Sequence, residues 1–160
     1  MRGIARIAIL WITGLAASPA WAQEMKVVET DGLEVIFQSP AADYLVPYTI
    51  QTFENALAAQ RRLFDYVPDG KPALMLRDFT DRGNAMITTA PRNRIFYDVA
   101  PMNLVFETFS PGERVYTIAN HETVHLVTSD QAGPTEKTAR RWLGGKVGPV
   151  AEHPETLLYY

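Results

Sequence analysis

One helical segment in the C-terminal half constrains the fold of this chain more than any other feature. Residues 116–129 (YTIANHETVHLVTS) contain a single formally charged side chain, that of Glu122. Apolar residues spread over much of the surface that this helix would present: Val115, Ile118, Ala119, Leu126 and Val127. A helix that is apolar on most sides is buried in a protein core. The rest of the chain must therefore supply the layers that cover it.

The start of this helix is predicted from the residues that precede it. In Ser110-Pro111-Gly112-Glu113, serine takes the N-cap, proline the first helical position and glutamate the third. This is a capping box, in which the Ser hydroxyl and the Glu carboxylate each accept a hydrogen bond from a free backbone N–H group. We predict a helix from Ser110 to about Ser129.

The same segment contains His121-Glu122-Thr123-Val124-His125, which follows the pattern HExxH. Residues four apart lie on one face of a helix, so both imidazoles can bind one zinc ion at about 2.0–2.1 Å. Glu122 lies about 100° further around the helix, where its carboxylate can reach a water molecule on that ion. The pattern indicates a hydrolytic zinc site with His121 and His125 as ligands and Glu122 as the general base. The alternative is structural: both histidines pack in the core, and Glu122 bonds to the backbone or to an arginine.

A catalytic zinc site needs a third protein ligand, and the sequence leaves that ligand open. The metzincin pattern requires glycine at position 128 and histidine at position 131, where this chain has Thr128 and Gln131, so that class is excluded. Asp130 is one residue away from the position at which some zincins place an aspartate. The remaining candidates lie near the end of the chain or beyond it: Glu152, His153 and Glu155. Taken alone, the histidine of this group is typical of a surface residue.

The composition excludes several classes of protein. The chain has 160 residues, enough for one domain, and its 47% hydrophobic and 21% charged residues are typical of a globular protein. Its formal net charge of -3 argues against a nucleic-acid-binding protein, since such proteins are basic. The absence of cysteine excludes disulfide bonds, cysteine zinc ligands and thiol nucleophiles.

Residues 1–22 have the pattern of a signal peptide. Two arginines precede the apolar run 7–17, and Ala20-Trp21-Ala22 has the form of a signal-peptidase site. We predict cleavage before Gln23 and export to the periplasm or to the medium. The apolar run has about half the length that a membrane-spanning helix needs, so no stable membrane span is expected after cleavage. The alternative is an uncleaved signal anchor.

Residues 23–160 are predicted to form one α+β domain, a small mixed or antiparallel sheet with the HExxH helix packed on it. Hydrophobic alternation and turn residues predict a hairpin over 25–38 around Asp31-Gly32, followed by strands over 73–79, 85–89 and 94–99. Further helices are predicted over 41–66, with Pro47 in the first turn or at a kink, and over 134–143, ending at Gly144-Gly145.

Two short basic clusters, Arg61-Arg62 and residues 137–141 (KTARR), lie on predicted helices. Charged residues on a helix usually form its solvated face, so we expect both clusters to be exposed. The aromatic residues of 106–109 are expected to contribute to packing.

At the HExxH helix the chain resembles the glutamate-type zincins (gluzincins), and more narrowly the N-terminal part of secreted bacterial proteins with a peptidase MA-like domain. Besides HETVH, the shared residues are Asp78-Phe79, Gly83-Asn84-Ala85, 91–95 (PRNRI), 106–109 (FETF) and 153–156 (HPET). The resemblance covers roughly residues 35–160. It implies a zincin-like fold, Zn²⁺ as the cofactor and a peptide or protein as the substrate.

The resemblance also implies a substrate-binding edge strand beside the metal helix, which holds the peptide by backbone pairing. Arg92, Asn93 and Arg94 could flank this strand, and the alternative for them is an ordinary polar turn. The family's third zinc ligand is a glutamate in a Trp-x-x-Glu-Gly-x-Ala stretch on a later helix, and nothing in this sequence matches it. We therefore expect the chain to be the front piece of a longer protein.

Together these features predict an exported zinc metallopeptidase of gluzincin type, or its N-terminal portion. One alternative is a non-catalytic envelope module that keeps the zincin-like fold without a complete site. Another is a plain α+β domain in which HExxH occurs by chance.

Overall fold

A five-stranded mixed sheet is the centre of the structure, a computed structural model that describes residues 23–81, 83–100 and 113–146. The elements in chain order are β1 (Glu24–Glu29), β2 (Glu34–Ser39), α1 (Val46–Leu63), β3 (Ala73–Arg77), β4 (Asn84–Thr88), β5 (Arg94–Asp98), α2 (Arg114–Asp130) and α3 (Pro134–Trp142). Across the sheet the strand order is β1-β2-β3-β5-β4. Strands β2, β3 and β5 are parallel, and the outer strands β1 and β4 are antiparallel to their neighbours. The prediction of helices combined with a mixed sheet is confirmed.

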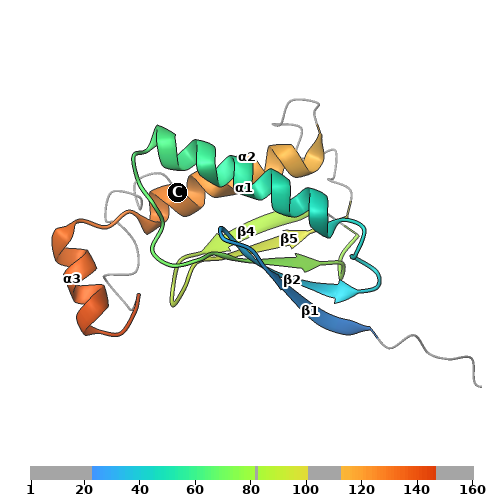
Figure 1. Ribbon diagram of the computed structural model, residues 1–160, viewed down its shortest axis with the longest axis horizontal. Coiled ribbons are helices and arrows are strands. Elements are labelled where there is room, and N and C mark those ends of the chain that lie inside the picture. The colour runs from blue at the N-terminus through green and yellow to red at the C-terminus, as the bar shows by residue number, and fades with distance from the viewer. Residues whose placement is uncertain (1–22, 82, 101–112, 147–160) are drawn as a thin grey trace, which may run out of the picture.

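Helices α1 and α2 pack against each other and lie over one face of the sheet (Figure 1). The strands turn alternate residues toward these helices: in β2, Val35 and Phe37 are buried, whereas Ile36 between them is partly exposed. From α2, Ala119 and Leu126 enter the same core and are fully buried. The HExxH helix is therefore covered by α1 and by the sheet, as its low charge predicts.

The other face of the sheet carries an apolar stripe that crosses all five strands in register. Val27 of β1 pairs with Ile36 of β2, which is aligned with Met75 of β3, Phe96 of β5 and Met86 of β4. The two ends of this stripe are 57% and 53% exposed, because the strands that carry them lie at the sheet edges. The alternation of side chains along a strand thus places a second apolar surface opposite the core.

The hairpin prediction is confirmed, and so is the prediction of a helix after the HExxH helix. β1 and β2 pair antiparallel around the turn that contains Asp31-Gly32. Helix α3 ends before Gly144 and Gly145, whose φ angles of 71° and 151° favour glycine over other residues.

Two helix starts differ from prediction. Helix α1 begins at Val46 rather than at residue 41, because successive turns at residues 40–45 precede it, and Pro47 lies in its first turn. Helix α2 begins at Arg114, so the predicted N-cap at Ser110 is wrong. Glu113 is the N-cap residue in an extended conformation, with φ −68° and ψ 125°. Its carboxylate accepts hydrogen bonds from the first free N–H groups, which is the role that the prediction gave to serine.

None of the helices in the described residues is long and apolar enough to cross a membrane. The predicted signal peptide, residues 1–22, lies outside the described residues, as do the aromatic residues of 106–109.

Candidate metal centre

Helix α2 holds the two motif histidines together. The Nε2 atoms of His121 and His125 lie 3.1 Å apart, and their rings meet edge to face with centroids separated by 4.6 Å. Two nitrogen ligands on one tetrahedral zinc ion are separated by about 3.3 Å when each zinc–nitrogen distance is about 2.0–2.1 Å. The side chains are therefore arranged nearly as two ligands of one small ion must be. The exposed position of His121 also leaves this pair open to solvent, which differs from the structural alternative of two core histidines.

The environment of His121 favours the form that binds metals. Burial lowers the pKa of His121, and the neighbouring His125 lowers it further. A lower pKa keeps the imidazole neutral at neutral pH, and only a neutral imidazole has a lone pair for a metal ion.

Glu122 is more buried than the two motif histidines. The residue is only 8% exposed, and burial raises the pKa of its carboxyl group to about 7. Among the described residues its carboxylate has no hydrogen-bond or ion-pair partner. The structural alternative, a bond to the backbone or to an arginine, is therefore not found in residues 23–81, 83–100 and 113–146. A carboxyl group with a pKa near 7 can both accept and release a proton at neutral pH, as a general base must.

No third ligand for a metal ion is found next to the two histidines among the described residues. Within them, no group of three His, Asp or Glu side chains is arranged to hold a metal ion. The candidates Glu152, His153 and Glu155 lie outside the part of the chain that the structure describes. Asp130 is buried in another cluster and cannot turn toward the histidines.

That cluster is a buried ionic network at the C-terminal end of α2. The Asp130 carboxylate is fully buried and forms ion pairs with Arg140 of α3 and with Lys146. It also accepts a hydrogen bond from the backbone N–H of Asp69, and the Tyr66 hydroxyl donates to the Asp130 carbonyl at 2.8 Å. The network joins α2, α3 and the loop after α1.

This network was missed by sequence reasoning, which expected residues 137–141 to be solvated. Arg140 is only 3% exposed, so the prediction is wrong for this residue, while Lys137 and Arg141 are exposed as expected. Asn93 is also buried: its side chain donates to the Asp69 carbonyl at 3.1 Å and accepts from the Lys146 ammonium at 2.7 Å. No local sequence pattern predicts such contacts, because the partners are 10 to 77 residues apart along the chain.

The arginines on either side of Asn93 each have a polar partner. Arg92 forms an ion pair with Glu34, and Arg94 donates to the Ala90 carbonyl at 3.1 Å. Strand β4, which precedes this turn, is the edge strand beside α2. One side of β4 pairs with β5, and its other side has no strand partner among the described strands.

A comparison with known protein families, with characterised proteins and with solved structures finds no match to this chain. The resemblance to the gluzincins therefore stays a prediction that depends on the residues quoted for it.

Proposed function

We propose that this chain is an exported zinc-dependent metallopeptidase of gluzincin type, or the N-terminal portion of one. The observation that carries the proposal is the pair of imidazole nitrogens 3.1 Å apart on α2 next to a buried carboxyl group with a pKa of about 7. His121 and His125 would hold the ion, and Glu122 would hold the proton that is moved. The chemistry that zinc supplies in such a site is Lewis-acid activation of water and of a peptide carbonyl group.

The arrangement of β4 supports a peptide as the substrate. An extended peptide can add to a free strand edge through backbone hydrogen bonds, and among the described strands β4 is the edge next to the helix that carries the motif. A peptide held along β4 would lie beside α2. We expect the third ligand to be Glu152, His153 or Glu155, or to lie beyond Tyr160.

The first test is the zinc content of the purified chain, beside the variants His121→Ala and His125→Ala. We expect close to one zinc per chain, and loss of zinc in both variants. Asn120→Ala is a matched control, because Asn120 is on the same helix and its side chain donates to the Tyr116 carbonyl. Equal zinc content in all four proteins would refute a site built on the two histidines.

A second variant separates a peptidase from a non-catalytic module. Glu122→Gln should abolish peptide hydrolysis and leave the zinc content unchanged, because the amide cannot accept the proton from water. Hydrolysis that survives this change would contradict the mechanism. Stoichiometric zinc without hydrolysis in the wild-type chain would instead favour the non-catalytic envelope module, which the missing third ligand among the described residues also favours.

A further inference from the structure

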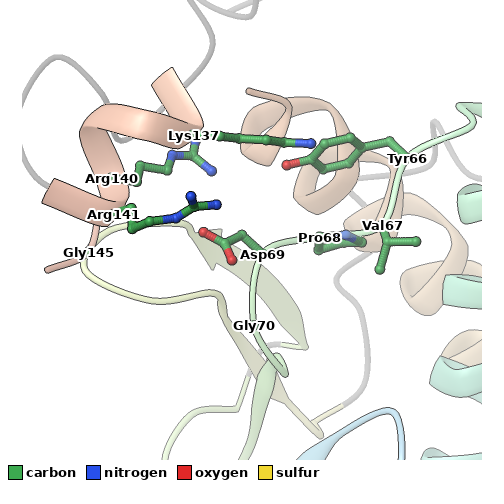
Figure 2. A pocket seen from close by; sticks show the side chains of 9 residues that line it. All are labelled: Tyr66, Val67, Pro68, Asp69, Gly70, Lys137, Arg140, Arg141 and Gly145. Carbon is green, nitrogen blue, oxygen red and sulfur yellow. The ribbon is translucent and has the colours of Figure 1, made fainter. Parts of the chain in front are cut away.

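A cavity of about 440 Å³ lies between α3 and the loop that follows α1, near the C-terminal end of α2 (Figure 2). Its walls are formed by Tyr66, Val67, Pro68, Asp69, Gly70, Lys137, Arg140, Arg141 and Gly145. We call it the α3 cavity. Its volume falls within the range of cavities that hold small organic molecules, about 300–1,000 Å³.

The lining of the α3 cavity is positive. It contains three cationic side chains, Lys137, Arg140 and Arg141, and one carboxylate, Asp69 (Figure 2). Arg140 is paired with Asp130, so Lys137 and Arg141 against Asp69 leave a surplus of one positive charge in a chain whose formal net charge is -3. A concave wall with charges of one sign concentrates ions of the opposite sign. The cavity is therefore an attractive place for an anion.

The floor of the cavity is rigid because the buried network holds it. Arg140 is 3% exposed and fixed by its ion pair with Asp130, whose Oδ1 lies 3.1 Å from Nη1 of the arginine. Tyr66 is fixed by the hydrogen bond from its hydroxyl to the Asp130 carbonyl. Arg140 and Tyr66 are therefore held in place before an anion enters, which lowers the entropy cost of contacts with this floor.

The rim carries two cations that the network does not use. Lys137 lies over the Tyr66 ring, with Nζ 5.1 Å from the ring centroid, and Arg141 is one helical turn further along α3. Neither has a carboxylate within ion-pairing distance among the described residues. The dipole of α3 favours the two arginines near its C-terminus. It does not explain why Lys137, one turn earlier on α3, lines the same cavity.

We propose that the α3 cavity binds a small organic anion, whose phosphate or carboxylate group lies between Lys137 and Arg141 and whose hydroxyl groups face Asp69. The guanidinium fork and the ammonium group are the usual partners of such oxyanions. The Asp69 carboxylate is an acceptor in the same cavity, so it suits a ligand that also carries hydroxyl donors. This proposal is independent of the metal site, since none of its residues belongs to the HExxH motif.

Calorimetric titration of the purified full chain tests the proposal with three probes. Glucose 6-phosphate carries a phosphate and hydroxyls, gluconate carries a carboxylate and hydroxyls, and glucose is the neutral control. We expect one site per chain for at least one of the two anions and none for glucose; the stronger anion identifies the acid group. Absence of binding by both anions, or equal binding of glucose, would overturn the proposal.

Variants locate the site. In Lys137→Gln/Arg141→Gln the affinity for the preferred anion should fall at least tenfold, and in the matched control Arg62→Gln, on an exposed part of α1, it should not change. Asp69→Asn should raise the affinity for inorganic phosphate about threefold, because a repulsive charge is removed while the backbone N–H bond to Asp130 is kept. Affinities unchanged in the double variant would place the anion elsewhere and refute the assignment.

Discussion

Replacing Glu122 with glutamine should stabilise the metal-free chain at alkaline pH. The carboxyl group has an ordinary pKa of 4.5 in the unfolded chain, and burial raises this pKa to about 7 in the folded state. One pKa unit corresponds to about 1.4 kcal/mol, so ionising this buried group costs the folded state about 3 kcal/mol. Glutamine has the same shape and no charge to desolvate.

The sign of the pH dependence follows from proton binding. Between pH 4.5 and about 7 the folded state keeps the proton on Glu122 while the unfolded state has lost it. The free energy of unfolding of the wild-type chain therefore falls as pH rises through this window, and the loss is complete above it. At pH 5 the Glu122→Gln variant should be more stable than the wild-type chain by only about 1 kcal/mol, because most of the loss lies between pH 5 and 7. At pH 8 the variant should be more stable by about 3 kcal/mol.

Urea unfolding of both proteins in the presence of a chelator, at several pH values from 5 to 8, measures this difference. The lowered pKa of His121 is common to both proteins, so its contribution cancels in the difference. Glu24→Gln is the control, because Glu24 lies on the exposed outer strand β1. A stability difference that is the same at pH 5 and at pH 8 would refute a desolvated carboxyl group at position 122.

Three further predictions concern the fold. Asp130→Asn should lower the free energy of unfolding by about 3–5 kcal/mol, because it removes the negative charge that pairs with two buried cations, and guanidinium unfolding would show it. Leu126→Ala, in the core, should cost about 2–5 kcal/mol, whereas Leu143→Ala, at an exposed position, should cost little; equal losses in thermal unfolding would contradict the packing of α2. Glu113→Ala should lower the free energy of unfolding by about 1 kcal/mol, because it removes the N-cap acceptors of α2. A variant as stable as the wild-type chain in thermal unfolding would refute Glu113 as the N-cap.

The sequence alone determined the elements and the motif, since both depend on residues that are close along the chain. Asp31-Gly32 predicted the hairpin, and the four-residue spacing of His121 and His125 predicted that their side chains meet. The low charge of residues 116–129 predicted a buried helix. Each of these signals depends on residues that are close along the chain, so it can be interpreted without knowledge of a distant partner.

Only the tertiary structure decided which polar residues are buried together. Arg140, Asp130 and Asn93 are polar residues of two helices and a turn, which local patterns place in solvent. Ion pairs and hydrogen bonds that join Arg140, Lys146 and Asn93 to Asp130 and to the loop after α1 nevertheless leave all three buried. The raised pKa of Glu122 has the same origin, because it depends on what covers α2 rather than on the motif. Desolvation is a property of the assembled layers, and a linear pattern does not contain it.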